Sequence, residues 1–184
     1  MAQLYDTHDF WQTQPVPQSN EVVNDCDMDK PIDAVKTPDE IPDDPLPIPA
    51  GFTWCNVNIA NDEEAKEVYT LLTQNYVEDD DNMFRFDYSV PFLQWALLPP
   101  GYKEDWLFGV RGGKKNKLFG FISAIPVNMT VNGKQMEMAE VNFLCVHKSL
   151  RDKRLAPTLI KEVTRRVNKC DIWQAIYTAG VVIP

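Results

Sequence analysis

The residues with the clearest chemistry lie where an apolar segment changes into a basic one. Residues 140–154 have the sequence EVNFLCVHKSLRDKR, which places Arg151, Lys153 and Arg154 in a short loop. A helix is expected to begin near Pro157, because proline is favoured in the first helical turn. The first N–H groups of a helix have no partner inside it, so with these cations they would bind a pyrophosphate. A merely solvated basic loop is the alternative.

A run of four acids forms the second candidate site. Residues 78–81, EDDD, repel one another, which is tolerable if the loop is exposed or meets cations. From composition alone, a solvated loop after a helix is the simpler explanation. A loop that meets cations is the alternative.

Cys145 and His147 belong to the same segment as the basic loop. No activating base is adjacent to Cys145, so we interpret it as a buried strand residue and not as a nucleophile. His147 has two open roles, a proton carrier or a structural residue beside a turn, of which the second is more common. The four cysteines are widely spaced and form no Cys/His ligand set, so we predict no metal site.

Three helices are expected around these candidate sites. Asn61, with Glu64 three residues later, predicts the start of the first helix. The second covers residues 92–98 and is stopped by two prolines. The third follows the basic loop and has apolar residues at steps of four. The apolar faces of the first and third helices are Ala65, Val68, Leu71 and Leu72, and Leu155, Leu159, Val163 and Val167.

A run of antiparallel strands is expected between the second and third helices. The Asn132-Gly133 pair predicts a tight hairpin turn within it. A last buried strand is expected over residues 172–177. The other strands are predicted at residues 106–110, 118–125, 128–131 and 135–146. This order of elements predicts one mixed α+β domain over residues 51–184.

Residues 1–50 are expected to form an irregular, extended N-terminal arm. They contain 8 of the 14 prolines and 11 of the 27 acids, and proline fixes φ and removes a hydrogen-bond donor. Phe10 and Trp11 are the exception within the arm. Aromatic side chains of this size seldom stay in water, so the pair is expected to dock on the folded part or on a ligand.

Charge is unevenly divided along the chain. Residues 1–100 contain 20 acids and 4 bases, whereas residues 101–184 contain 7 acids and 14 bases. The net charge of −9 argues against a general nucleic-acid binder, although a basic face on the second half remains open. With no secretory signal, no apolar run near the ~18 residues of a membrane span and dispersed cysteines, we expect a cytoplasmic protein. We also expect a monomer.

Residues 140–148 resemble the N-myristoyltransferase signature E-[IV]-N-F-L-C-x-H-K at every position. The resemblance covers nearly the whole chain, through further segments in the same order. These segments are residues 10–16, 75–88, 120–126 and 177–182. A nonapeptide signature with four ordered segments is far more specific than a lone glycine loop.

The resemblance implies an acetyltransferase-like (GNAT-type) fold, a mixed sheet flanked by helices, and an acyltransferase activity. The family moves a tetradecanoyl group from myristoyl-CoA to the N-terminal glycine amine of other proteins, with no tightly bound cofactor. The attacked thioester carbonyl develops an oxyanion. By resemblance, the backbone N–H groups of Phe143 and Leu144 would stabilise it, each by about 2.7–4 kcal/mol.

Two sets of binding residues also follow from the resemblance. The myristoyl-CoA set is Phe10, Trp11, Phe143, Leu144, Cys145, Val146, Arg151, Asp152, Lys153, Arg154, Leu155 and Ala156. The peptide set, for substrates with an N-terminal glycine, is Val77, Asp79, Asp81, Phe84, Phe86, Tyr88, Asn142 and Thr178. Residues 151–156 are also similar to the R-x-x-G-x-A pyrophosphate loop of acetyltransferases, with Arg154 in place of glycine. Because backbone amides bind the phosphates, this replacement need not abolish binding.

The chain ends at Pro184, whereas members of the family continue through a second half of comparable or greater size. By resemblance that half holds a second signature around K-F-G-x-G-D-G, one wall of the peptide groove and the terminal carboxylate that serves as base. We therefore expect a truncated product or fragment, the acyl-CoA-binding half of the enzyme. The open alternatives are a non-catalytic acyl-CoA or peptide-binding module and a small GNAT-type N-acetyltransferase.

Overall fold

The computed structural model describes residues 10–18, 30–34, 36–76 and 86–178. The chain divides into two compact units, Met1–Thr37 with Ala179–Pro184, and Pro38–Thr178. In the first unit, Trp11–Thr13 forms one 3₁₀ turn, and the rings of Phe10 and Trp11 pack edge to face with centroids 4.9 Å apart. The second unit contains the sheet and the three α-helices described below.

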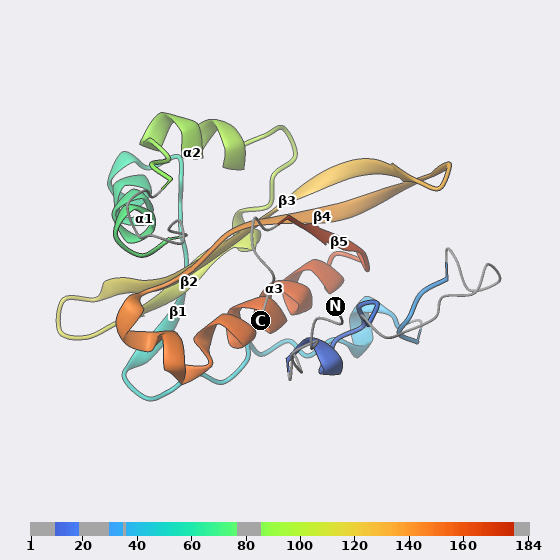
Figure 1. Cartoon of the computed structure of the whole chain (residues 1–184), viewed down its shortest axis with the longest axis horizontal. Helices are drawn as coiled ribbons and strands as arrows, with labels where there is room; N and C mark the ends of the chain where they lie inside the picture. Colours follow the sequence, from blue (N-terminus) through green and yellow to red (C-terminus); the bar gives the residue numbers. More distant parts are fainter. Residues whose placement is uncertain (1–9, 19–29, 35, 77–85, 179–184) are drawn as a thin grey trace, which may run out of the picture. The chain divides into compact units, whose positions relative to one another are not determined.

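A five-stranded sheet with the order β1-β2-β3-β4-β5 forms the centre of the second unit (Figure 1). Strands β1 (Phe52–Asn56), β2 (Leu107–Gly112), β3 (Lys117–Val131) and β4 (Lys134–Val146) pair antiparallel in sequence order. Strand β5 (Ala175–Tyr177) pairs parallel to β4. The predicted fold class, a mixed sheet flanked by helices, is confirmed.

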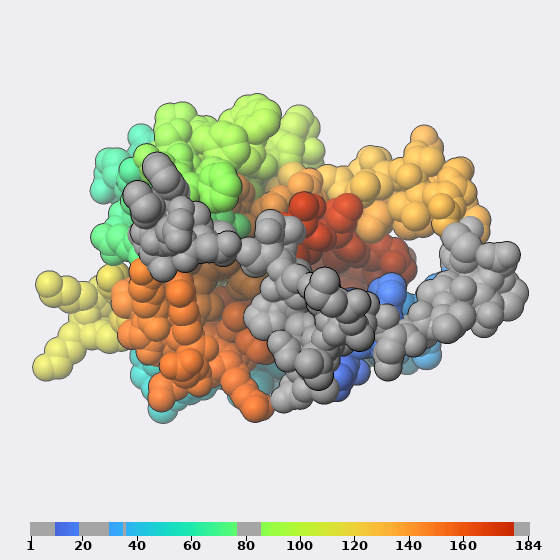
Figure 2. Space-filling view, in the orientation of Figure 1, coloured from blue at the N-terminus to red at the C-terminus, as the bar shows by residue number. Residues whose placement is uncertain are grey.

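Strands β3 and β4 form the expected hairpin. Asn132 and Gly133 have φ of 48° and 79°, and positive φ at both central residues is what a type I′ turn requires. β3 is continuous where two strands were predicted. Pro126 has no N–H to donate, but no hydrogen bond of the β3–β4 ladder is lost at this position. Its partner Ala139 points its own N–H away from β3, to the other side of β4, where it donates to the Gln174 carbonyl (2.9 Å). Figure 2 shows the yellow-to-orange end of this hairpin projecting past the helices.

The helices cover both faces of the sheet (Figure 1). α1 (Asp62–Asn75) and α2 (Val90–Leu97) pack on one face, and α3 (Leu155–Asn168) packs on the other. Asn61 caps α1 as predicted, since its side chain accepts from the N–H groups of residues 63 and 64. α2 begins two residues earlier than predicted, because Ser89 caps it.

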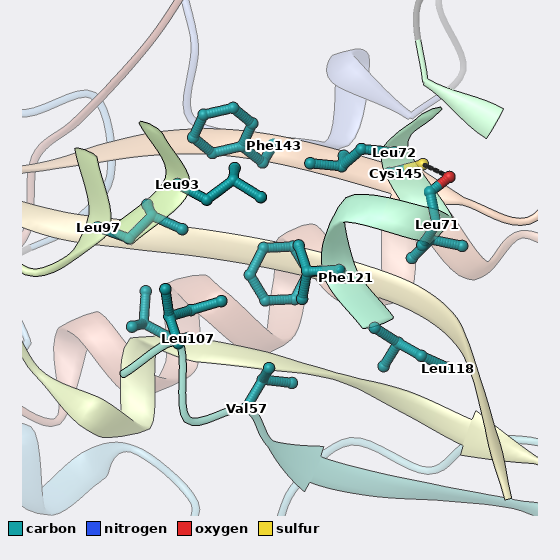
Figure 3. Packing of buried hydrophobic residues seen from close by; sticks show 12 residues of the cluster. Val57, Leu71, Leu72, Leu93, Leu97, Leu107, Leu118, Phe121, Phe143 and Cys145 are labelled. Carbon is teal, nitrogen blue, oxygen red and sulfur yellow. Dashed lines mark hydrogen bonds between the residues drawn. The ribbon is translucent and has the colours of Figure 1, made fainter. Parts of the chain in front are cut away.

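Two hydrophobic clusters result from this arrangement. Figure 3 shows the first, in which side chains of α1 and α2 meet Phe121 and Phe143 of the sheet. The second lies under α3, where Leu155 and Leu159 approach the sheet at Gly120. A Cβ at Gly120 would lie 3.2 Å from both leucines, so a glycine there permits the close packing of α3. All four predicted apolar residues of α3 are buried.

Two predictions about the ends of the sheet need correction. The predicted buried strand over residues 172–177 is only the three-residue β5, and Tyr177 is 38% exposed. The reason is that β5 lies at the edge of the sheet, where β4 alone pairs with it among the described strands, so one side of β5 is left uncovered by a neighbouring strand. Ile172 is buried but lies before the strand. β1 was not predicted, because its FTWCN sequence lacks a clear alternation of polar and apolar residues.

Part of the proline-rich segment is bound to α3 by polar contacts. The fully buried carboxylate of Glu162 accepts from the Leu46 N–H (3.0 Å) and from the guanidinium groups of Arg165 and Arg166 (2.7 and 2.8 Å). The Leu46 carbonyl accepts from the Trp54 indole (2.7 Å). Burial alone would raise the pKa of Glu162, but these hydrogen bonds outweigh it and hold the pKa below its usual value.

Candidate functional site

Strand β4 is irregular at Phe143. Its register with β3 shifts between Asn142 and Cys145, so that Phe143 and Leu144 have no partner of their own in β3, which the structure describes in full. Phe143 has a φ of 54°, in the left-handed region that residues other than glycine seldom adopt. At this β-bulge, Phe143 and Leu144 together lie opposite the single residue Ile122 of β3, so the β3–β4 ladder is locally disrupted.

The bulge is fixed from both faces of the sheet. Phe143 packs into the cluster under α1 and α2, whereas Leu144 packs against the cluster under α3. The fully buried Ser123 donates its hydroxyl to the Asn142 carbonyl at 2.8 Å, which holds the peptide just before the bulge. Because both side chains are committed, the strained backbone at Phe143 cannot relax without opening the core.

Aromatic side chains gather on the α2 side of the bulge. The rings of Tyr88 and Phe143 meet edge to face with centroids 5.2 Å apart. Tyr88 also stacks on Phe86 (5.8 Å) and on Phe92 (5.4 Å). Of the predicted peptide residues, Phe86 and Tyr88 therefore form one aromatic surface that ends at the bulge. Phe86 is 62% exposed, so this surface is open to solvent within the described part of the chain.

Tyr76 is a further group beside the bulge. Its ring lies 6.3 Å from that of Phe143, centroid to centroid. Burial raises the pKa of its phenol well above the usual value, and the neighbouring Tyr177 and Tyr88 act in the same direction. A hydrogen bond from the Phe143 backbone N–H opposes this rise. The Tyr76 hydroxyl is therefore neutral at physiological pH.

A basic turn, Lys148–Lys153, follows β4 as a 3₁₀ helix. His147 caps this turn, because its Nδ1 accepts from the Ser149 N–H at 3.3 Å and lies 2.9 Å from the Ser149 hydroxyl. Partial burial, together with the charge of Lys117, lowers the pKa of His147 and so favours the neutral form that can accept. This geometry favours the structural role for His147 over a proton carrier.

Arg154 joins the basic turn to α3. It has a φ of 56°, and its side chain makes no capping hydrogen bond to the first N–H groups of the helix. α3 begins at Leu155, two residues before the predicted start at Pro157. The left-handed backbone explains why the R-x-x-G-x-A pattern has glycine at this position, since glycine adopts positive φ without strain. It leaves the N-terminal amides of a 14-residue helix beside three exposed cations, Arg151, Lys153 and Arg154.

The structure brings most of the predicted myristoyl-CoA-binding residues onto one strand, turn and helix. Residues 143–146 form the end of β4, residues 151–153 belong to the basic turn, and residues 154–156 begin α3. The Cys145 thiol is buried and donates to the Leu71 carbonyl at 3.8 Å. Phe10 and Trp11 belong to the other compact unit, so their contact with acyl-CoA stays a prediction.

The predicted peptide residues are only partly described. Thr178 follows Tyr177, which pairs with Val141, so Thr178 lies next to the position of Asn142 in the sheet. Together with the aromatic surface, these two residues lie around the bulge. The other four, Val77, Asp79, Asp81 and Phe84, lie outside the described residues, as does the acidic run at residues 78–81.

A surface groove of about 680 Å³ lies elsewhere on the second unit. It is lined by Arg165, Arg166 and Lys169 near the C-terminal end of α3, and it contains none of the predicted site residues. Three of the four cations that line it are already engaged, since Arg165 and Arg166 bind Glu162, and Lys169 binds Asp43 at 2.6 Å, while Lys103 is the fourth. The strained bulge and the basic turn are therefore the better candidate site.

Comparison with known proteins identifies the family. Residues 31–184 match the family model for Myristoyl-CoA:protein N-myristoyltransferase, N-terminal domain. The chain belongs to the N-myristoyltransferase family. The family resemblance of residues 140–148 is thereby confirmed.

The N-myristoyltransferase relatives are close in sequence and structure. The chain is 56% identical over 175 residues to the glycylpeptide N-tetradecanoyltransferase of Kluyveromyces lactis, covering 95% of this chain and 38% of that protein. It is 58% identical over 177 residues to that of Dictyostelium discoideum, covering 96% and 42%. A Saccharomyces cerevisiae N-myristoyltransferase crystal structure with bound myristoyl-CoA matches with a TM-score of 0.88 and 54% identity, covering 97% of this chain and 42% of that one. The chain thus spans about two fifths of the length of these relatives.

The sequence did not single out three residues that support the candidate N-myristoyltransferase site. Asn75 and Tyr76 end α1 next to the basic turn and the bulge, and Ser123 fixes the bulge from β3. A signal existed for the first two, because they open the segment 75–88 that resembles the family. No local pattern marks Ser123, whose role depends on the strand pairing.

Proposed function

We propose that the chain is the acyl-CoA-binding N-terminal half of a glycylpeptide N-tetradecanoyltransferase. In this proposal the complete enzyme transfers a tetradecanoyl group from myristoyl-CoA to the N-terminal glycine amine of protein substrates. The observation that carries the proposal is the bulge at Phe143, which is followed directly by the basic turn and the amino end of α3. The relative from Saccharomyces cerevisiae, matched over 97% of the chain, has bound myristoyl-CoA.

The bulge amides act on the thioester. When the glycine amine attacks the thioester carbonyl, negative charge develops on its oxygen, and the N–H groups of Phe143 and Leu144 donate to it. Each such donor stabilises the transition state by about 2.7–4 kcal/mol in other oxyanion holes. The tetrahedral adduct then collapses, the C–S bond breaks, and the electron pair leaves with the coenzyme A sulfur.

No covalent enzyme intermediate is required, because the amine is itself the nucleophile. A glycine α-amine has a pKa near ~8, so a modest proton acceptor frees enough of it at neutral pH. Cys145 takes no part in the chemistry, since its thiol is buried against the Leu71 carbonyl. His147 caps the basic turn and lies outside the reacting atoms.

The basic turn and α3 bind the other end of the acyl-CoA. The helix N-terminal amides carry partial positive charge and have no side-chain cap, so they bind phosphate oxygens. The exposed cations of Lys153 and Arg154 add electrostatic attraction. The glycine peptide would then approach over Phe86 and Tyr88 toward Asn142 and Thr178.

We also propose a cytoplasmic location, protein N-myristoylation and lipoprotein biosynthesis as the biological context. Cys55, Cys145 and Cys170 are free thiols, which fits a reducing compartment. Across the described residues, none of the helices has both the length and the apolar character that crossing a bilayer demands.

Titration calorimetry of this chain with myristoyl-CoA, coenzyme A and acetyl-CoA tests the proposal. We expect saturable micromolar binding of myristoyl-CoA that is tighter than that of acetyl-CoA. A preference for acetyl-CoA would instead support the small N-acetyltransferase. A transfer assay with a glycine-initial peptide, with and without the remaining domain of a relative, then separates an active half from a binding module. No saturable binding of myristoyl-CoA would overturn the proposal.

A further inference from the structure

The last turn of α1 contacts both parts of the proposed site. Tyr76, the residue after the helix, contacts Phe143 at the bulge. Asn75, its neighbour, is 4% exposed and contacts the basic turn. One residue pair therefore connects the place proposed for the thioester with the place proposed for the phosphates.

Asn75 binds the basic turn through two different atoms. Its side-chain Oδ1 accepts from the Lys148 N–H at 3.0 Å, and its backbone carbonyl accepts from the Arg151 guanidinium at 2.5 Å. Its side-chain Nδ2 donates to the Leu71 carbonyl at 2.9 Å. The same Leu71 carbonyl accepts the Cys145 thiol, as Figure 3 shows. The end of α1 is thus attached to β4 and to the turn that follows it.

The contact of Arg151 has a clear physical basis. The last carbonyls of a helix have no partner within it and carry the negative end of the helix dipole. A guanidinium group that donates to such a carbonyl forms a charge-assisted hydrogen bond with it. Lys153 and Arg154 differ from Arg151, since the structure gives no hydrogen bond for their side chains to any described residue. The three cations of this segment therefore do not have one role.

We propose that Arg151 and Asn75 form a clamp that positions the basic turn on α1, and that Arg151 is a positioning residue and not a phosphate ligand. The proposal rests on the proposed function, because the value of the clamp lies in holding the phosphate-binding turn at a fixed separation from the bulge amides. A single acyl-CoA must reach both places at once. In this proposal Arg151 would leave the set of residues predicted to bind the cofactor.

Binding of myristoyl-CoA to the whole chain and to three variants tests the clamp. Arg151→Met is expected to weaken binding about tenfold, as for the loss of one charge-assisted hydrogen bond, equally at low and high salt. Lys153→Met, the matched control from the same turn, is expected to lose affinity at low salt and to approach wild type at high salt, where phosphate attraction is screened. Arg151→Lys should recover part of the loss.

A double-mutant cycle tests whether the two residues act together. Asn75→Ala removes the acceptor for Lys148, and combining it with Arg151→Met should weaken binding no more than the larger single effect. Additive losses would overturn the clamp. A loss for Arg151→Met that disappears at high salt would also overturn it, by making Arg151 a phosphate ligand.

Hydrogen exchange of the unliganded chain tests the clamp without any ligand. The Lys148 amide is bound to Asn75, so Arg151→Met should speed its exchange about tenfold, while Lys153→Met should not. Unchanged exchange in Arg151→Met would overturn the clamp. A wild-type chain that fails to bind myristoyl-CoA would overturn the proposed function and leave this exchange test decisive for the clamp.

Discussion

The chain has two strained residues in one strand–turn–helix unit, and they are held in opposite ways. Phe143 and Arg154 both adopt left-handed backbone, with φ of 54° and 56°. Phe143 is 8% exposed and packs among Tyr76, Tyr88 and the core under α1 and α2. Arg154 is exposed and makes no capping contact.

The difference shows what each site needs from its residue. At the bulge, the side chain is required to hold the backbone in a conformation that it would not choose, so glycine could adopt the backbone but could not fix it. At the start of α3, the fold requires only the backbone, and a glycine would adopt it more easily. The backbone at position 154 therefore does not depend on the arginine side chain, whereas the backbone at position 143 depends on the packing of phenylalanine.

The largest expected effect comes from placing glycine at the buried member of the pair. Phe143→Gly should destabilise the chain by about 3 kcal/mol, because removing a buried phenyl costs ~3–5 kcal/mol and relief of left-handed strain returns ~1 kcal/mol. Urea denaturation measures the change. Phe121→Gly, which removes a fully buried phenyl from the same cluster, should lose more stability, since no such strain is relieved there. Equal stability of Phe143→Gly and wild type would contradict the comparison.

Charge reversal at the exposed member should affect binding and not folding. Arg154→Glu is expected to weaken myristoyl-CoA binding tenfold or more, about 1.4 kcal/mol, with a loss that shrinks as salt rises. Calorimetry at two salt concentrations measures it. The control Lys134→Glu, at the tip of the β3–β4 hairpin, should bind as wild type. Equal losses in both variants would show that only net charge matters.

Glycine at the exposed member should stabilise the chain. Arg154→Gly removes the left-handed strain and is expected to add about 1 kcal/mol to the free energy of unfolding. Arg154→Ala loses the same charge and keeps the strain, so it is the matched control and should not be stabilised. Thermal or urea unfolding of the two variants decides the matter, and a more stable alanine variant would be evidence against strain at this position.

The smallest expected effect is the pH dependence of the turn between the two residues. The pKa of His147 is lowered on folding, so the unfolded chain binds more protons between that pKa and the ordinary value near ~6.5. Stability should therefore fall as pH drops through this window. His147→Asn, which keeps a capping side chain, should flatten this part of the profile. Unfolding midpoints of the wild type and of His147→Asn, measured from about pH 7.5 to about pH 5.5, test this pH dependence. Identical pH profiles for the two would show that titration of His147 does not contribute to stability.

The sequence predicted those features that depend on local patterns. The Asn61 cap, the four apolar residues of α3 and the Asn132-Gly133 turn are each determined by neighbours within a few residues, and all three are confirmed. Residues 140–148 indicated the family because a nine-residue signature can be recognised in the sequence without knowledge of the fold.

The features that failed depend on contacts between distant residues. Pro126 led to the prediction of two separate strands. In the structure Ala139, which lies opposite it, donates its N–H to the other side of β4, so the proline leaves the β3–β4 pairing intact. The edge position of β5 is set by strand order and not by its own sequence. Likewise, nothing in the composition of the basic turn tells Arg151 from Lys153, because the carbonyl that binds Arg151 belongs to a helix 76 residues earlier.

The buried carboxylate of Glu162 has a consequence for where cooperative folding begins along the chain. It needs the Leu46 N–H as well as two guanidinium groups, and Arg165 also donates to the carbonyls of Pro42 and Asp43. Cleavage by a protease between residues 46 and 50 would detach the segment that supplies the Leu46 N–H and the two carbonyls, and would leave the buried carboxylate with its two guanidinium partners alone. Although it lacks regular strands and α-helices, the proline-rich stretch from residue 42 to 46 should therefore unfold together with α3.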